Sequence, residues 1–204
     1  QLIRGFFNTV IYVLLYLGFG LVLSLTSGYV LAKRDLLFRD AIMFMISFTM
    51  LFHGGTVPTY INLQNLGMMD TIWAVVLPGS LSVMNLILMR TAFATVPESL
   101  LESARLDGAS ELRILWSISM PLIKATIATV SLYLVIGMWN SWFPAAMYLR
   151  DRALYPMQLI LREILIVNQD ASISAEAMAA LDGSDANLYK QLVKYCTIIV
   201  SSAP

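Results

Sequence analysis

Four long stretches of this sequence contain no Asp, Glu, Lys or Arg, and this pattern limits the possible folds more than any other feature. They are residues 5–32, 41–69, 71–89 and 125–149. A helix needs about 20 apolar residues to cross roughly 30 Å of bilayer hydrocarbon. A soluble protein of 204 residues can bury one such helix but not four. With 58% hydrophobic and only 13% charged residues, the chain is predicted to be an all-α integral membrane protein, a bundle of transmembrane helices.

We predict four complete spans within a single transmembrane domain that covers residues 1–204. The first span is residues 5–32 and the last is 125–149, while the two apolar stretches on either side of Asp70 form two spans joined by a turn. The outer tip of this hairpin includes His53, Gly54, Gly55 and Pro58. Residues 195–204 are apolar but cover only half of a crossing, which predicts a truncated fifth span.

Two polar segments lie between the predicted spans. In residues 91–121, Thr95 and Glu98 match the S/T-x-x-E capping box, so a helix is expected to start there. Gly108 can end that helix with a positive φ angle, and Ser110 can cap a second helix. The segment is therefore predicted to be a helix, a turn and a helix, although periodicity alone equally allows an ordinary amphipathic loop.

The second polar segment, residues 150–187, is predicted to lie outside the membrane. Its apolar residues recur at helical spacing from Pro156, which predicts a helix in the outer interface extending to about Gln169. The following residues, up to about 187, are rich in Asp, Ser and Ala and predict a solvated loop. Lys and Arg residues divide almost evenly between the two sides, so charge alone does not orient the chain.

The spacing within residues 91–121 resembles the EAA signature of binding-protein-dependent importer permeases, E-A-A-x3-G-x9-I-x-L-P. Ser103 replaces the second signature residue and Met120 replaces the leucine, and both replacements are similar in size to what they replace. We call residues 91–121 the signature loop. The resemblance implies that this loop is cytoplasmic and couples the permease to an ATPase. The residues that it implicates are Glu102, Ser103, Ala104, Asp107, Gly108, Ala109, Ile118 and Pro121.

Within this resemblance, Glu102 is expected to meet a basic residue of the ATPase, and Ala104 to keep the docking face small. The segments from Trp139 to Ala146 and from Leu154 to Gln158 resemble the carbohydrate branch of the same family. Members usually have six spans, so the first is expected to be missing here and the last incomplete. The resemblance covers essentially the whole chain.

The resemblance also implies the partners of this chain. They are a second permease subunit that forms a heterodimer with it, a cytoplasmic ATPase dimer and an external sugar-binding protein. The expected location is the cell membrane, as a multi-pass protein in contact with the lipid bilayer. No cofactor and no catalytic role are expected, because ATP hydrolysis belongs to the separate ATPase.

Polar and aromatic residues of the third and fourth spans form a candidate sugar path: Ser82, Asn85, Trp139, Asn140 and Trp142. A buried amide in a membrane needs a hydrogen-bond partner, which either a substrate hydroxyl or a neighbouring helix can supply. The tryptophans can equally belong to an interfacial aromatic belt. Both interpretations remain open.

Other functions fit the sequence less well. No phosphate-binding loop of the G-x-x-x-x-G-K-[ST] type is present, and Gly18 and Gly20 favour helix packing inside the first span. With His53 and Cys196 as the only histidine and cysteine, neither a clustered metal site nor a membrane hydrolase is expected.

The spans lack the ionisable residues of an ion-coupled transporter, and the zero net charge gives no nucleic-acid footprint. The alternative is a permease of the same type for amino acids or peptides. Such a permease should lack the Trp-Asn-x-Trp-Phe-Pro segment at residues 139–144.

Overall fold

The computed structural model describes residues 2–33, 35–52, 54–166 and 195, and no strand occurs among them. The helical elements in chain order are α1 (Leu2–Ala32), α2 (Arg39–Leu51), α3 (Thr56–Asn65), α4 (Ile72–Val76), α5 (Val83–Ala94), α6 (Glu98–Leu106), α7 (Glu111–Ile114), the π-helical turn η1 (Leu115–Ser119), α8 (Met120–Leu122), α9 (Lys124–Trp139), α10 (Phe143–Tyr148) and the 3-10 turn η2 (Arg152–Leu154), followed by a helical segment at 157–166. The prediction of an all-helical fold is confirmed for these residues.

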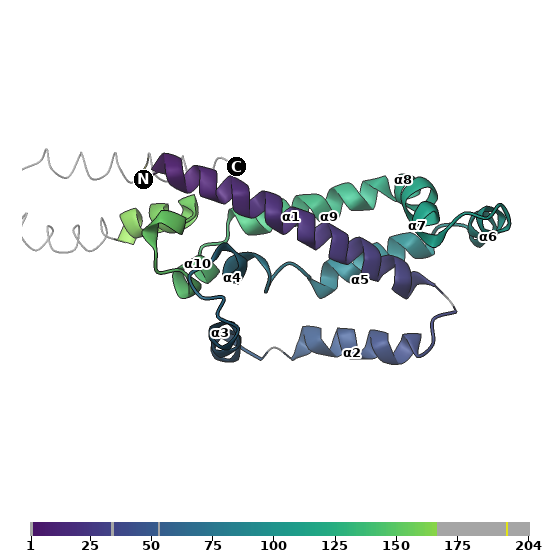
Figure 1. The fold of residues 1–204 in the computed structure, drawn as a ribbon, viewed down its shortest axis with the longest axis horizontal. Coiled ribbons are helices and arrows are strands. Elements are labelled where there is room, and N and C mark those ends of the chain that lie inside the picture. Colours follow the sequence, from purple (N-terminus) through teal and green to yellow (C-terminus); the bar gives the residue numbers. More distant parts are fainter. Residues whose placement is uncertain (1, 34, 53, 167–194, 196–204) are drawn as a thin grey trace, which may run out of the picture.

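Helix α1 is the axis of the bundle and runs along α5 and α9 (Figure 1). Glycines let these helices approach closely. A Cβ atom on Gly28 would lie 2.7 Å from the Cβ of Met89, and one on Gly20 would lie 3.0 Å from the Ser80 carbonyl oxygen. The predicted packing role of Gly20 is therefore confirmed. A Cβ on Gly18 would meet no atom of the described residues within 4 Å, so packing among them does not explain that glycine.

Only the first of the four predicted spans is one long helix. Among the described residues, α1 alone is long and apolar enough to cross a membrane by itself. Two bent pairs reach that length together, α2 with α3 and residues 111–122 with α9. The number of spans therefore stays a prediction.

Each of the other three predicted spans is divided into two helices. Residues 41–69 divide into α2 and α3, residues 71–89 into α4 and α5, and residues 125–149 into α9 and α10. Glycine and proline account for the breaks. Gly55 has a φ angle of 85° before α3, and Pro144 starts α10 because its missing N–H is not needed in a first helical turn.

Helix α2 has no buried residue. It touches the bundle mainly through α5, and its large apolar side chains, such as Phe44, Met45 and Leu51, are exposed. In a membrane, such a surface faces lipid or another transmembrane helix rather than water.

The first third of α1 holds the irregular segment that follows α10. The Asn8 amide donates to two carbonyls in residues 153–155, and the Tyr12 hydroxyl donates to a third, at 2.8–3.1 Å. The Thr9 hydroxyl accepts a hydrogen bond from the Met157 N–H at 2.9 Å. These side chains replace the partners that the segment lacks because it is not a regular helix.

The predicted outer helix is present at residues 157–166. Its Met157, Leu159 and Leu161 side chains are buried, and Gly5 of α1 lies against it, so its apolar face packs on the protein. Its predicted extension to Gln169, the solvated loop up to 187 and the truncated span at 195–204, Tyr195 excepted, lie outside the described residues.

A matched pair of glycine substitutions tests the close packing of α1. Gly28→Ala should destabilise the protein by about 1–3 kcal/mol, because the added methyl group overlaps Met89 and the backbone of α5. Gly18→Ala lies in the same helix with open space around it and should be neutral or stabilising. Thermal unfolding of the detergent-purified protein measures both. Equal melting temperatures would show that this contact does not limit helix packing.

Candidate functional site

The signature loop forms the predicted helix, turn and helix at the end of the bundle opposite the N-terminus (Figure 1). Gly108 follows α6 with a φ angle of 80°, in the left-handed region that glycine adopts without strain. The N–H of Ala109 donates to Ala104 and that of Gly108 to Arg105, both at 3.0 Å. These two bonds form a Schellman motif, which satisfies the last carbonyls of α6 and fixes the direction of the reversal.

The start of α6 differs from the prediction. Thr95 does not cap α6, because its hydroxyl donates to the Ala92 carbonyl at 2.7 Å and it ends α5 as its C-cap. Pro97 is the N-cap residue of α6 and provides no side-chain hydrogen bond. The predicted capping box is therefore wrong, because α6 begins at Glu98, two residues later than a cap at Thr95 requires.

The second half of the loop follows the prediction more closely. The Ser110 hydroxyl accepts a hydrogen bond from the Arg113 N–H at 3.4 Å and caps α7. The chain continues through the π-helical turn, which contains Ile118, into α8, where Pro121 occupies the first turn. Residues 111–122 and α9 then meet at 87°, so this corner sets the direction in which the chain leaves the loop.

The outer face of the loop combines carboxylates with apolar side chains. Glu102, Ser103 and Asp107 are exposed. Leu106, Leu112 and Trp116 are 89%, 69% and 61% exposed, respectively. Large apolar side chains that stand this far out at a polar tip mark an interaction surface.

Ala104 is not part of this outer face. It is only 8% exposed and packs in the same core cluster as Tyr29, Phe93 and Ile114. Its predicted place on a docking face is therefore wrong, and its small size instead lets α6 lie close to the bundle. Ala109 is half-buried against the same cluster.

Glu111 was not predicted as a site residue, yet three side chains donate hydrogen bonds to it. Its carboxylate accepts hydrogen bonds from Tyr29 at 2.6 Å, from Lys33 at 2.7 Å and from Arg105 at 3.3 Å. The Lys33 and Tyr29 hydrogen bonds lower the pKa of Glu111 from 4.5 to about 2. The group is therefore charged throughout the physiological range. From the sequence, a carboxylate at the start of a helix predicts a favourable interaction with the helix dipole and nothing more. No sequence signal therefore identified Tyr29, Lys33 and Arg105 as its donors.

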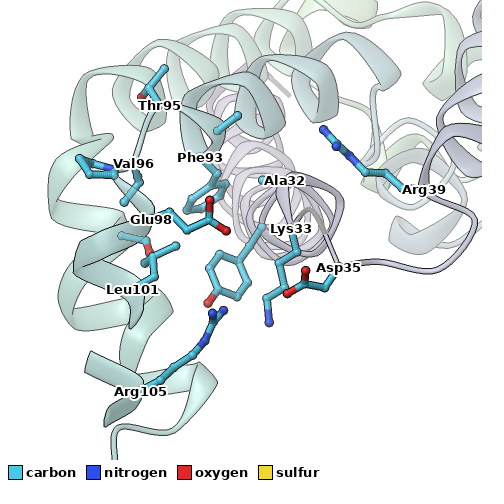
Figure 2. Close-up of a pocket in the computed structure, with 14 residues that line it drawn as sticks. Ala32, Lys33, Asp35, Arg39, Phe93, Thr95, Val96, Glu98, Leu101 and Arg105 are labelled. Carbon is cyan, nitrogen blue, oxygen red and sulfur yellow. The ribbon is translucent and has the colours of Figure 1, made fainter. Parts of the chain in front are cut away.

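A cavity of about 390 Å³ lies beside this carboxylate, between the end of α1 and α6. Lys33 and Arg105 reach into the space from the two sides, and Asp35 and Glu98 also line it (Figure 2). Ser119 lies at its edge, 1% exposed, and its hydroxyl has no hydrogen-bond partner within the described part of the chain. The cavity contains groups of both signs, so it does not favour one charge of ligand.

The predicted sugar-path residues lie at the start of α5 and from the end of α9 to the start of α10. Ser82 is the N-cap residue of α5, and Asn85 is buried one turn further along. At the C-terminal end of α9, the Asn140 amide donates to the Ile136 carbonyl at 3.0 Å. The role of these residues in a sugar path stays a prediction.

The two tryptophans differ in their surroundings. Trp139 packs edge to face on Phe6, with 6.0 Å between ring centroids, and its indole N–H is buried without a partner among the described residues. The Arg162 guanidinium lies 3.2 Å from the Trp142 ring centroid and covers one face of that ring. One face of the Trp142 ring is therefore covered, whereas the Trp139 N–H is a donor without a partner among the described residues.

A second cavity, of about 310 Å³, lies at the break between α4 and α5. Its lining includes Tyr16, Gly79, Gly137, Ser141 and Tyr148, and none of the predicted path residues belongs to it. The Tyr16 hydroxyl donates to the Gly79 carbonyl and so satisfies one backbone group at the break. Irregular backbone of this kind is tolerated at membrane depth where it is buried in protein or lines a cavity.

Asp70 connects the turn before α4 to the chain after α10. It has a φ angle of 59°, and its carboxylate accepts hydrogen bonds from the backbone N–H groups of Arg150 at 2.8 Å and Asp151 at 2.9 Å. Its own N–H donates to the Tyr148 carbonyl at 2.9 Å. The N–H groups of Asp151 and Arg150 lower the pKa of Asp70 below its usual value.

Comparison with known proteins identifies the family. Residues 2–181 match the family described as the binding-protein-dependent transport system inner membrane component. The chain belongs to this family. The predicted resemblance is thereby confirmed, as is the placement in a membrane, while the roles of individual signature residues remain predictions.

Several relatives of this family member are named as permeases. It is 38% identical over 182 residues to the polygalacturonan/rhamnogalacturonan transport system permease protein YtcP of Bacillus subtilis (strain 168), which covers 89% of this chain and 62% of that protein. It is 31% identical over 124 residues to the sn-glycerol-3-phosphate transport system permease protein UgpE of Yersinia enterocolitica, which covers 60% of this chain and 44% of that protein.

A solved structure has the same fold. One chain in the crystal structure of a bacterial ABC transporter involved in the import of the acidic polysaccharide alginate superposes with a TM-score of 0.77 at 29% identity. The match covers 93% of this chain and 63% of that chain. The present chain thus spans less than two thirds of the length of these relatives.

Substitutions of Gly108 test the reversal in the signature loop. Gly108→Ala should cost about 1–2 kcal/mol, because an L-residue is strained in the left-handed region, whereas Gly108→Asn should cost less because asparagine visits that region. No atom lies within 4 Å of a Cβ at this position, so steric overlap does not complicate the comparison. Hydrogen exchange of residues 98–118 in lipid nanodiscs measures the effect. Faster exchange in the asparagine variant than in the alanine variant would contradict the assigned turn.

Substitutions of Asp70 test the connection on the opposite side of the bundle. Asp70→Ala removes both acceptor interactions and should lower the melting temperature and speed tryptic cleavage after Arg150 and Arg152. Asp70→Asn retains an acceptor oxygen and tolerates the positive φ angle, so its effect should be clearly smaller. Identical cleavage rates in the two variants would show that the side-chain acceptor does not hold this segment.

Proposed function

We propose that this chain is one of the two membrane-spanning permease subunits of an ATP-driven, binding-protein-dependent importer of saccharides, with no catalytic site of its own. The observation that supports this most is the signature loop. It presents exposed carboxylates and apolar side chains at one end of the bundle, and its buried side packs on the helices that carry the apolar spans. A docking element needs both an outer recognition face and a firm attachment.

In this proposal the outer face of the loop binds a separate cytoplasmic ATPase. Glu102 supplies a negative charge for a basic residue of that subunit, and Leu106, Leu112 and Trp116 supply apolar contact area. Aromatic and apolar side chains in the centre of an interface contribute most of its binding energy, and a charge at the rim contributes specificity. Gly108, Ser110 and Pro121 contribute indirectly, by holding the two short helices in position.

The remaining partners follow from the other surfaces. The second permease is proposed to form a heterodimer with this chain and to cover part of its exposed apolar surface, with lipid covering the rest. The external sugar-binding protein is proposed to dock at the opposite end, where residues 148–157 are fixed by α1 and Asp70. The loop up to 187, which we expected to touch that protein, lies outside the described residues.

A saccharide is the proposed substrate class. The relatives YtcP and the alginate importer are named for polysaccharides, and the segment at residues 139–144 resembles the carbohydrate branch of the family. Both observations favour a sugar over the alternative of an amino acid or peptide. The proposed path passes Ser82, Asn85, Trp139, Asn140 and Trp142, and the Trp139 N–H is a buried donor without a partner in the described chain.

The substrate class is tested with the intact transporter. The full-length permease is purified with its partner permease, ATPase and binding protein, and the ATPase rate is measured with acidic and neutral oligosaccharides, amino acids and peptides. Stimulation by a saccharide alone supports the proposal. Stimulation by an amino acid or a peptide, with no response to any saccharide, would overturn the substrate class and leave the transporter type intact.

The docking role of Glu102 is tested with the same complex. Glu102→Lys should reduce co-purification of the ATPase on the order of tenfold, because charge reversal replaces an attraction with a repulsion at the interface. Ser103→Ala changes the neighbouring exposed residue to the family residue and should bind the ATPase normally. Normal ATPase binding and normal uptake in the Glu102→Lys variant would show that this face of the loop is not the docking site.

A further inference from the structure

Glu111 joins the two helices of the signature loop to α1, which lies about 80 residues earlier in the sequence. It is the first residue of α7, and its carboxylate receives the hydroxyl of Tyr29 from α1, the ammonium of Lys33 from the end of α1 and the guanidinium of Arg105 from α6. One side chain therefore connects both helices of the signature loop to the longest helix of the bundle. Glu111 lies outside the signature residues.

The donors from α1 are themselves held in place. Tyr29 is 8% exposed, and its ring packs edge to face on Phe93 of α5, with 5.5 Å between centroids. The Lys33 ammonium lies 4.9 Å from the centroid of the same tyrosine ring. A carboxylate that accepts from such fixed groups has few alternative positions, so the contact defines the orientation of α7 relative to α1.

The exposure of these groups argues against a mainly stabilising role. The Glu111 side chain is 49% exposed, and those of Lys33 and Arg105 are 31% and 38% exposed. Ion pairs this accessible to solvent contribute little to stability, because water and salt screen them. The three directional hydrogen bonds instead define the position of α7 relative to α1 and α6. The loop also contacts the bundle through apolar packing, which permits sliding more readily than directional hydrogen bonds do.

We infer that Glu111 is the positioning residue that makes the signature loop move together with α1, so that displacement of the loop by the ATPase reaches the opposite end of the bundle. The inference rests on the proposed coupling role of the loop. Helix α1 has 31 residues, which at 1.5 Å each span about 46 Å. Its far end holds residues 153–157 through Asn8, Thr9 and Tyr12. A rigid connection at Glu111 therefore links the docking loop to the segment on the other side of the bundle.

The test is the number of saccharide molecules imported per ATP hydrolysed by the complete transporter in proteoliposomes. A change that merely destabilises the protein lowers both rates in proportion and leaves this ratio unchanged. Glu111→Gln keeps the size of the side chain but loses its charge, and Tyr29→Phe removes only the hydroxyl. Each should lower the ratio roughly fivefold or more while the ATPase remains bound.

Two comparisons make the result specific. The double variant should be little worse than either single variant, because Glu111→Gln weakens and Tyr29→Phe removes the same hydrogen bond, so their effects should not add fully. Asp35→Asn is the matched control. Asp35 lines the same cavity but makes no hydrogen bond or ion pair with Glu111, so this variant should retain the normal ratio.

An unchanged ratio in Glu111→Gln, or fully additive losses in the double variant, would overturn the inference. The Glu102→Lys variant separates this failure from failure of the proposed function. If Glu102→Lys loses the ATPase while Glu111→Gln keeps its ratio, the loop is still the docking site and only the role of Glu111 is wrong. If the loop variants all retain ATPase binding and uptake, the proposed coupling role is wrong as well.

Discussion

Polar side chains of α1 satisfy backbone and carboxylate groups that the rest of the bundle leaves without partners. Tyr12, Tyr16 and Tyr29 donate, respectively, to the Leu154 carbonyl, to the Gly79 carbonyl and to Glu111. A backbone group that packs against protein and is not paired within a helix needs such a partner, because an unpaired buried polar group costs free energy. The breaks at α4–α5 and after α10 therefore depend on α1.

This dependence requires α1 to lie very close to its neighbours. Gly28 and Gly20 remove the side chains that would otherwise separate it from α5 and α9, and close packing replaces the hydrophobic driving force that is weak between helices in lipid. The result is one long helix in contact with both functional ends. One end carries the signature loop, and the other holds the segment at residues 148–157.

Two carboxylates complete this arrangement, one at each end. Glu111 accepts from groups about 80 residues earlier in the chain, and Asp70 accepts from N–H groups about 80 residues later. The hydrogen bonds lower the pKa of both groups, so each remains charged at physiological pH and acts as a permanent connection rather than a pH switch. Because both are well exposed, their contribution is mainly geometric.

The sequence alone determined the features that depend on local chemistry. The absence of charge over long stretches implied the membrane, the signature spacing indicated the family, and Gly108 and Ser110 predicted the turn and the second cap, since each acts on residues within a few positions of itself. Only the tertiary structure decided that Thr95 belongs to α5, that Ala104 faces inward and that Glu111 binds α1. Those outcomes depend on groups that the fold brings together from distant positions, or on where one helix ends and the next begins. Local spacing contains neither kind of information.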